Sequence, residues 1–521
     1  MLKQFVNGRI LTPKGWLDGG SIVTDGNRIR AVSNINLHVV GAEIIDAKGG
    51  YIVPGGIDMH AHGGGGRDFI EGCEDAFRAA VNAHLKHGTT AIYPTLSSST
   101  VPTIEAACTV CEKLMNEKDS PVLGLHIEGS YINRKQAGAQ NPVLIKAPII
   151  YEYESLLKKY KCIKRWDEAP ELPGSVRFIK ELRSHGVLSA LTCTRATYED
   201  VVKAHDAGMT HASHFYNAMP VVYKEHEFKV PGTVESVYAL QDMTVEVIAD
   251  GIHVPPVMLK IVYKIKGVEK TALITDSLAY AASEGDVSAE ARVIMEDGVC
   301  KLADRSVLAG SIATMDVLIR TCIQKAEIPM IDVFRMASET PAKIMGVFDR
   351  KGSIEEGKDA DLMVFDKDIN LTYVMQMGKR DYKQPLISHL YINKDSLYIN
   401  KHSLYINITR AGFHKGIQPF NMLNQSERLQ FAFDSLNTTF YVALDVERHN
   451  RVVQRHAQQP PTGFVHIAAT NTQSLVVWLN NRPAFHSCCL CLHILKHLRS
   501  LSLKVGIGEL YSYLLALLWL L

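Results

Sequence analysis

Residues 54–66 read Pro54-Gly55-Gly56-Ile57-Asp58-Met59-His60-Ala61-His62 followed by four glycines, and the chain is organised around this stretch. Tyr51-Ile52-Val53 leads into it as an apolar strand. Because side chains alternate along a strand, His60 and His62 project from the same face, where both ring nitrogens can reach one metal ion at about 2.0–2.1 Å. The glycines allow the backbone to turn sharply beside a ligand. An ordinary polar turn is the alternative, and the rest of the sequence decides between the two.

The composition is that of a globular protein with a large core. The chain has 521 residues, 46% of them apolar, and a formal net charge of +1. It therefore has no basic field to bind nucleic acid. Its ten cysteines have no framework spacing, and we interpret Cys108 and Cys111 as core residues of a helix over 104–114. The N-terminus has no signal-peptide core, and the apolar residues 510–521 are too few to span a bilayer. We expect a cytoplasmic protein.

The order of strand and helix patterns predicts the fold class. Residues 1–50 read as short strands, and Asn7-Gly8 and Asp25-Gly26 each predict a two-residue hairpin. Strands then alternate with amphipathic helices such as 75–86 and 198–207, which is typical of an α/β protein with a parallel sheet or barrel. The eight candidate strands lie at 51–60, 89–96, 122–128, 161–168, 187–193, 210–216, 244–251 and 271–277. Eight repeats predict a (β/α)8 TIM-like barrel.

We therefore predict three regions. The barrel occupies 51–344, and the short strands at 345–380 pair with 1–50 in a small β-sandwich domain. The gap at 129–160 is long for a loop of such a barrel and is a candidate active-site lid. Residues 381–521 contain three Leu-Tyr-Ile-Asn copies at a spacing of seven, whose composition favours β structure. We interpret this tail as no functional domain; an accessory domain is the alternative.

Polar residues recur at the ends of successive candidate strands. His126 and Glu128 share a strand face, and Glu128, at the tip, is the better ligand candidate. The other strand ends carry Cys193, His211 and His214, Asp250 and His253, and Asp276. So many ionisable groups at one end of a barrel are costly to bury unless a cation pairs with them. Imidazole and carboxylate ligands suit zinc, and also iron, manganese or cobalt. This pattern predicts metal-assisted hydrolysis, in which a carboxylate moves the proton.

Seven blocks of sequence together resemble the N-acetylglucosamine-6-phosphate deacetylases of the amidohydrolase superfamily. The resemblance covers residues 1–380, with every block in the family's order. The blocks are Pro54 to His62 with the glycine run, Gly124-Leu125-His126-Ile127-Glu128-Gly129, Gly138-Ala139-Gln140-Asn141-Pro142, His214-Phe215-Tyr216-Asn217-Ala218-Met219-Pro220, Ala249-Asp250-Gly251-Ile252-His253, Thr275-Asp276 and Leu308-Ala309-Gly310-Ser311.

The resemblance implies a role for each matching residue. Glu128 and His214 correspond to ligands of the main metal ion, and His60 and His62 add a second position, so that one or two ions are bound. Asp276 corresponds to the catalytic acid/base. The substrate contacts correspond to Ala139, Gln140, Asn217, Ala218, Gly251, His253, Leu308, Ala309 and Gly310. Family members are commonly dimers or tetramers, so the resemblance also implies a homo-oligomer.

Three positions depart from the family pattern. Cys193 stands where the family has a metal-binding His, and it is either a thiolate ligand or an inert buried residue. Gln140 stands where many members have a substrate-facing His, and it can still donate a hydrogen bond. Lys229 replaces the phosphate-binding Arg, with His226 as the nearby alternative.

The resemblance implies hydrolysis of the acetamide of N-acetylglucosamine 6-phosphate to glucosamine 6-phosphate and acetate. The departures keep two alternatives open. One is an amidohydrolase that acts on another N-acetylated sugar phosphate or on a cyclic amide. The other is a catalytically crippled protein that binds metal or sugar.

Overall fold

The computed structural model describes residues 1–285, 287–288 and 292–383, and six further strands between residues 397 and 478. The chain divides into two compact units, Met1–Ile387 and Ser388–Leu521. All eight predicted barrel strands are present in the first unit, and each pairs in parallel with its neighbours, which confirms the predicted fold class. In sheet order they are β8 (Gly56–Ala61), β11 (Thr89–Leu96), β12 (Leu125–Glu128), β13 (Ile163–Glu168), β14 (Leu188–Leu191), β15 (His211–Ala212), β18 (Thr244–Ile248) and β19 (Thr271–Ile274).

Backbone hydrogen bonds join the two ends of this sheet and close the barrel at its carboxyl end. The amide of Asp276, just beyond β19, donates to the carbonyl of His60 in β8 at 2.8 Å. The amide of His62 in turn donates to the carbonyl of Ser277 at 2.8 Å. The first and last strands therefore bring His60, His62 and Asp276 together.

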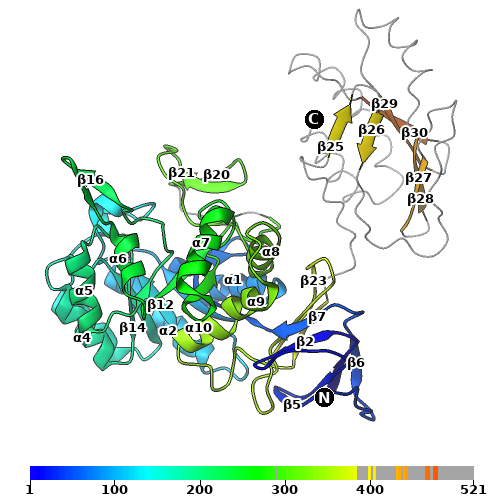
Figure 1. The fold of residues 1–521 in the computed structure, drawn as a ribbon, viewed down its shortest axis with the longest axis horizontal. Helices are drawn as coiled ribbons and strands as arrows, with labels where there is room; N and C mark the ends of the chain where they lie inside the picture. The colour runs from blue at the N-terminus through cyan, green and yellow to red at the C-terminus, as the bar shows by residue number, and fades with distance from the viewer. Residues whose placement is uncertain are drawn as a thin grey trace, which may run out of the picture. The chain divides into compact units, whose positions relative to one another are not determined.

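Helices connect successive strands and cover the outside of the barrel (Figure 1). They are α1 (Glu74–Lys86), α2 (Val101–Met115), α3 (Ile150–Lys159), α4 (Ser175–Ser184), α5 (Tyr198–Ala207), α6 (Thr233–Ala239), α7 (Pro256–Lys266), α8 (Met315–Gln324), α9 (Met330–Ala337) and α10 (Glu339–Ile344), with short 3-10 turns η1 (Phe69–Glu71), η2 (Arg134–Gln136), η3 (Pro142–Leu144) and η4 (Val268–Lys270). The helices predicted at 75–86 and 198–207 are confirmed as α1 and α5. Cys108 and Cys111 lie fully buried in α2, as expected of core residues.

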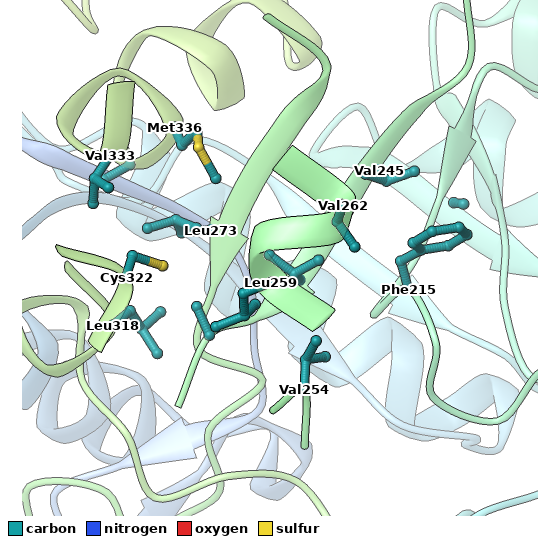
Figure 2. Close-up of a cluster of buried hydrophobic side chains, with 14 of the residues drawn as sticks. Phe215, Val245, Val254, Leu259, Val262, Leu273, Leu318, Cys322, Val333 and Met336 are labelled. Carbon is teal, nitrogen blue, oxygen red and sulfur yellow. The ribbon is translucent and has the colours of Figure 1, made fainter. Parts of the chain in front are cut away.

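The largest apolar cluster fills the space between the barrel and its helices. In Figure 2, Leu259 and Val262 of α7 lie between Leu273 of β19 and Phe215. All four side chains are at most 2% exposed. Burying a Leu or Phe side chain contributes roughly 1.5–3 kcal/mol, so this layer holds the helices against the strands that carry the candidate site.

The N-terminal and post-barrel segments form two further sheets, as the predicted fold class requires. One sheet has the order β5 (Arg28–Ser33), β4 (Ser21–Asp25), β1 (Leu2–Val6) and β6 (Glu43–Asp46). The other has the order β24 (Arg380–Lys383), β23 (Leu371–Gln376), β22 (Leu362–Phe365), β7 (Tyr51–Pro54), β2 (Arg9–Thr12) and β3 (Gly15–Leu17). Phe5, Ile22, Ile52, Leu362 and Met375 belong to the apolar core that both sheets share.

Two local predictions in this region are wrong. The single strand predicted at 51–60 is two strands in different sheets, since β7 pairs with β22 and β8 pairs with β11. Gly55 permits the passage between the sheets, because a Cβ there would lie 2.1 Å from Oγ1 of Thr90. Asn7-Gly8 is not a hairpin either. It links β1 and β2, which belong to different sheets, and Asn7 adopts a φ of 56° to make the turn.

Asp25-Gly26 and the glycine run do turn as predicted. Strands β4 and β5 pair in an antiparallel hairpin around Gly26. Gly65 and Gly66 have φ values of 58° and 85° and join β9 (Gly63–Gly64) to β10 (Arg67–Asp68). Two other short hairpins project from the barrel, formed by β16 (Tyr223–Glu225) with β17 (Phe228–Val230), and by β20 (Val293–Glu296) with β21 (Val299–Leu302).

The second unit contains an antiparallel pair and a four-stranded sheet. The pair, β25 (Leu397–Asn400) and β26 (Ser403–Ile406), holds the second Leu-Tyr-Ile-Asn copy and most of the third. The sheet has the order β27 (Gln430–Ser435), β28 (Thr438–Ala443), β29 (Phe464–Ala469) and β30 (Gln473–Trp478). The first copy and most of the tail lie outside the described residues. The interpretation of 381–521 as no functional domain therefore stays a prediction.

Candidate metal centre and active site

Six predicted residues meet at the carboxyl ends of the barrel strands. They are His60 and His62 from the end of β8, Glu128 from β12, Cys193 after β14, His214 after β15 and Asp276 after β19. All six are buried, with exposed fractions between 0% and 8%. Two groups of three have donor atoms close enough to share an ion: His60, His62 and Asp276 form one, and Glu128, Cys193 and His214 form the other.

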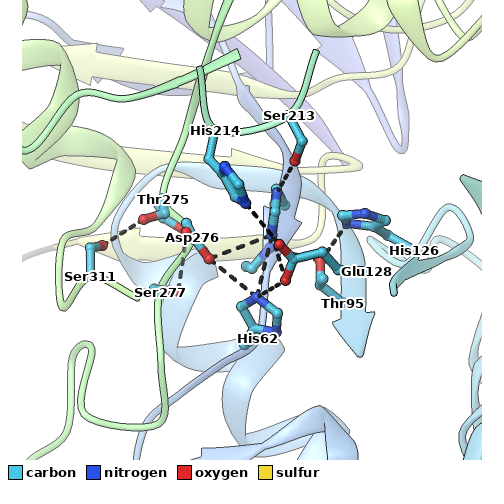
Figure 3. Close-up of polar contacts among 12 residues, drawn as sticks. His62, Thr95, His126, Glu128, Ser213, His214, Thr275, Asp276, Ser277 and Ser311 are labelled. Atoms are coloured by element: carbon cyan, nitrogen blue, oxygen red, sulfur yellow. Dashed lines mark hydrogen bonds and ion pairs between the residues drawn. The ribbon is translucent and has the colours of Figure 1, made fainter. Parts of the chain in front are cut away.

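Four donor atoms converge on one point between β8, β12 and β19 (Figure 3). Nε2 of His60 lies 3.3 Å from Nε2 of His62, 3.4 Å from Oδ1 of Asp276 and 3.8 Å from Oε2 of Glu128. Nε2 of His62 lies 3.2 Å from that Asp276 oxygen and 3.3 Å from that Glu128 oxygen. Four ligands placed tetrahedrally about 2.0–2.1 Å from zinc would lie about 3.3–3.4 Å apart. The spacing of these four donors therefore fits a four-coordinate divalent cation.

The second oxygen of Glu128 faces the other group. Oε1 lies 2.8 Å from Nε2 of His214, which also contacts Oγ1 of Thr192 at 3.0 Å and lies 4.0 Å from Sγ of Cys193. Glu128 thus reaches toward both groups with its two oxygens. Imidazole, carboxylate and thiol donors are a zinc-type set, so this second group also fits a cation.

Charge inside the site is balanced between the carboxylates and the histidines. Burial lowers the pKa of His60 and His62, but Asp276 and Glu128 more than offset it and raise the pKa values to about 9 and about 10. Burial raises the pKa of Glu128, yet the neighbouring histidines bring it well below its usual value, and they also lower the pKa of Asp276. The two carboxylates therefore require positive charge here, which either protons or a divalent cation supplies.

The backbone is strained at several of these positions. Cys193, His214 and Asp276 have φ values of 41°, 24° and 46°, in the left-handed region that L-residues rarely adopt. Each such conformation costs roughly 1–3 kcal/mol and persists only where the surroundings impose it. Strain at three strand ends that carry candidate ligands indicates that this end of the barrel is shaped for function.

The comparison with known proteins agrees with this geometry. The sequence pattern of the amidohydrolase family matches residues 51–390, which include the whole barrel. This chain belongs to the amidohydrolase family. It is an amidohydrolase-superfamily enzyme, as the sequence resemblance implied.

Similar proteins are named as sugar-phosphate deacetylases. The N-acetylglucosamine-6-phosphate deacetylase of Bacillus subtilis is 30% identical, and the match covers 63% of this chain and 83% of that protein. The N-acetylgalactosamine-6-phosphate deacetylase of Escherichia coli O157:H7 is 28% identical, with coverage of 71% and 97%. A crystallised mutant N-acetyl-D-glucosamine-6-phosphate deacetylase from Mycobacterium smegmatis, in complex with N-acetyl-D-glucosamine-6-phosphate, is 28% identical with a TM-score of 0.67, covering 73% and 98%. Within the described part of this amidohydrolase, no helix is long and apolar enough to cross a membrane.

Several predicted substrate residues lie beside the metal centre of this amidohydrolase. Gln140, in the segment at 129–149, donates from Nε2 to Oε2 of Glu128 at 2.7 Å. His253 contacts the carbonyl of Ala309 through Nε2 at 2.7 Å and the carboxylate of Asp250 through Nδ1. A Cβ on Gly310 would lie 2.5 Å from the carbonyl of Asp276, so only glycine fits there.

Other predicted residues lie next to these. Asn217 donates to the carbonyl of His214 at 3.2 Å, and Ala218 packs in a small apolar cluster with Cys193. Leu308 is 41% exposed. The carbonyl of Ala139 accepts a hydrogen bond from Arg292, and Gly251 follows Asp250 with a φ of 82°.

Lys229 and His226 are not brought to the cluster. Lys229 lies exposed in β17, paired with Lys224 of β16, and His226 occupies the hairpin turn. Among residues the structure describes, no hydrogen bond or ion pair joins Lys229 to the metal centre. Its role toward a phosphate stays a prediction.

Sequence reasoning missed a charged layer beneath the metal centre. Arg165, Asp167 and Glu246 are fully buried inside the barrel, and His60, His126 and Asp167 form a third group with donor atoms close together. A signal was available, because Arg165 and Asp167 stand two apart on a predicted strand and Glu246 interrupts an apolar one. Charged residues on the inner face of a barrel strand need partners from other strands.

Proposed function

We propose that this amidohydrolase hydrolyses the acetamide of N-acetylglucosamine 6-phosphate to glucosamine 6-phosphate and acetate. The observation that carries the proposal is the convergence of His60, His62, Glu128 and Asp276 at spacings that suit one cation. The relatives named above support the choice of substrate.

We assign the metal ligands from these donor sets. His60, His62 and Glu128 hold one ion with Asp276 beside it, and Glu128, Cys193 and His214 hold a second. We propose zinc; iron, manganese and cobalt share much of this ligand preference. A divalent cation bound there polarises the acetamide carbonyl and lowers the pKa of water.

Asp276 is assigned the proton transfer. Its pKa is lowered by the two histidines, so it is a carboxylate at neutral pH and can accept a proton from the attacking water. Among the four converging donors it is the most exposed, at 8%, which places it toward the incoming substrate. As the carbon–nitrogen bond breaks, Asp276 returns the proton to the amine nitrogen. The bond from the amide of Ser311 to its carbonyl, at 2.7 Å, holds this strand end in place.

The residues around the metal centre are assigned to the sugar. We propose that Gln140, Asn217, Ala218, His253 and Gly251 contact the sugar and its acetamide, together with Ala139, Leu308, Ala309 and Gly310. Lys229 is assigned to the phosphate, since an ammonium group is a competent phosphate partner.

A second candidate substrate is N-acetylgalactosamine 6-phosphate. A relative that is 28% identical over 97% of its own length is named as a deacetylase of that sugar. The two sugars differ at one hydroxyl, and a site that hydrogen-bonds one epimer leaves polar groups unpaired with the other. A cyclic amide, or metal and sugar binding without turnover, remain alternatives of lower standing.

The deciding experiment is acetate release from protein whose metal content has been counted. N-acetylglucosamine 6-phosphate, N-acetylgalactosamine 6-phosphate and unphosphorylated N-acetylglucosamine are compared on the same preparation. We expect release that requires both metal and phosphate. Bound metal without release from any of the three sugars would point to another substrate, and a protein that binds no metal would contradict the proposal.

The remaining parts of the proposal concern the whole chain. We propose a cytoplasmic homo-oligomer with a β domain from 1–50 and 345–380, a barrel at 51–344, and a tail at 381–521 that is no functional domain. Sedimentation analysis measures the oligomeric state. A truncation after residue 383 that keeps its fold and activity would support the assignment of the tail, and loss of either would contradict it.

A further inference from the structure

Glu246 is a carboxylate with no exposure, in β18, directly beneath the metal centre. Its Oε1 lies 2.8 Å from Nδ1 of His60, and accepts hydrogen bonds from Oγ of Ser213 at 3.0 Å and from Nη2 of Arg165 at 2.8 Å. Its Oε2 accepts from Nη1 of Arg165 at 2.5 Å and lies 3.2 Å from Nε2 of His211. With this many partners the carboxylate is held in a single orientation.

The contact with His60 determines which ring nitrogen faces the metal centre. An ionised carboxylate only accepts hydrogen bonds, so the proton of a neutral His60 lies on Nδ1. Its Nε2 then offers a lone pair toward His62, Glu128 and Asp276. A carboxylate behind a ligating histidine fixes the tautomer and the ring orientation and makes the histidine a stronger ligand.

Glu246 also reaches the second group of ligands. Its Oε1 accepts a hydrogen bond from the backbone amide of His214 at 3.3 Å, and its backbone carbonyl accepts from the amide of Phe215 at 2.7 Å. His214 has a φ of 24°, so its backbone is held in a conformation that it would not adopt unaided. One carboxylate thus contacts a candidate ligand of each ion.

Arg165 holds Glu246 against its neighbour Asp167. The guanidinium makes two bonds to each carboxylate, at 2.6 and 2.7 Å to Asp167. One positive and two negative charges leave a net charge of −1 on these three residues. A buried negative charge beneath the site favours a cation above it. The contacts of Asp167 differ from those of Glu246, because it meets His126 at 3.1 Å and has no printed bond to His60 or His214.

We propose that Glu246 is a positioning residue for the metal centre, orienting His60 and the backbone of His214 while Arg165 fixes its own orientation. The proposal rests on the metal centre of the proposed function. It does not depend on which sugar phosphate is the substrate.

The test compares three variants of the full chain by metal affinity. Glu246→Gln removes the charge and keeps the shape, Glu246→Asp keeps the charge and withdraws the oxygens, and Asp167→Asn removes a charge from the same arginine without touching either ligand. Zn²⁺ affinity is measured by competition with a chelator, and the fold of each metal-free variant by its thermal transition. We expect both Glu246 variants to bind Zn²⁺ 10- to 100-fold more weakly, and Asp167→Asn to lose less than half of that factor on a logarithmic scale.

Each outcome decides the proposal. Equal losses in Glu246→Gln and Asp167→Asn, with Glu246→Asp unaffected, would mean that charge alone acts, and would overturn it. Unchanged affinity in both Glu246 variants, or a wild-type protein that binds no Zn²⁺, would also overturn it. Should Glu246→Gln fail to fold, Glu246→Asp carries the test. A wild-type protein that binds Zn²⁺ but releases no acetate contradicts the proposed function and leaves this inference intact.

Discussion

Gln140 donates a 2.7 Å hydrogen bond to Oε2 of Glu128, the oxygen that faces His60 and His62. The amide of Ser98 donates to the other end of the Gln140 side chain at 2.6 Å, so its orientation is fixed. Gln140 comes from the segment that we interpreted as a lid. This bond therefore couples the lid segment directly to a candidate metal ligand.

Replacing Gln140 with Ala is expected to lower kcat/KM about 10- to 100-fold. A hydrogen bond to a charged group is worth about 1.5–3 kcal/mol, and each 1.4 kcal/mol is tenfold in rate. Steady-state kinetics on N-acetylglucosamine 6-phosphate measures the loss. Gln140→His restores a donor and is the conservative control, expected to retain most activity. A Gln140→Ala enzyme within twofold of wild type would show that the bond does not matter.

Replacing Asp276 with Asn is expected to lower kcat by about 10²- to 10⁴-fold, the usual contribution of general acid–base catalysis. The Asn oxygen keeps a donor near His60 and His62, so metal content per chain should stay close to wild type. Elemental analysis of the purified variant measures this. Asp276→Ala, which also removes the oxygen, is the comparison. Loss of metal in Asp276→Asn would recast Asp276 as mainly a ligand.

Cys193 should give up its proton when the second ion binds. Burial raises the pKa of its thiol, so the metal-free protein carries a protonated Cys193 at neutral pH. A thiol that ligates zinc is deprotonated, and the proton is released to solvent. We expect Zn²⁺ addition at pH 7 to release about one more proton per chain from wild type than from Cys193→Ser, measured with an indicator dye in weak buffer.

A spectroscopic control checks the same ligand. Co²⁺-loaded wild type should show thiolate-to-metal charge-transfer absorption that Cys193→Ser lacks. Equal proton release and identical spectra would identify Cys193 as an inert buried residue. Cys193→His, which restores the residue of the related deacetylases, should bind metal without that absorption.

His84 should make the metal-free protein less stable in acid. It is 1% exposed in α1, where its Nε2 lies 2.8 Å from the carbonyl of Gly63, and burial lowers its pKa to about 4. Between pH 6.5 and 4 the unfolded chain binds a proton at this residue and the folded chain does not. Stability is therefore lost as the pH falls through this window, by about 2 kcal/mol between pH 7.5 and 5.

The variant His84→Gln isolates this effect. Guanidinium unfolding of the metal-free protein at pH 7.5 and pH 5 gives the change in unfolding free energy for each variant. We expect the change to be about 2 kcal/mol smaller in His84→Gln than in wild type. The exposed His38, changed to Gln, should leave the change as in wild type. Identical pH dependence in His84→Gln and wild type would contradict the prediction.

Local sequence determined the strand and helix order and the end of the barrel at which function lies. The alternation of side chains placed His60 beside His62, and the apolar runs before Glu128, His214 and Asp276 marked strand ends. The structure confirms all eight strands and brings these residues together. These signals are local, because side-chain direction along a strand depends only on position within it.

Tertiary structure decided what local patterns leave open. The split of 51–60 into β7 and β8 depends on Thr90 and Asp361, which meet Gly55 from distant parts of the chain. The contacts of Glu246 with His60 and Arg165 depend on how three separate strands are staggered around the barrel. Hydrogen-bond register between strands is set by the closed barrel as a whole. Sequence alone thus identified the residues that face inward, and the closed barrel decided which of them meet.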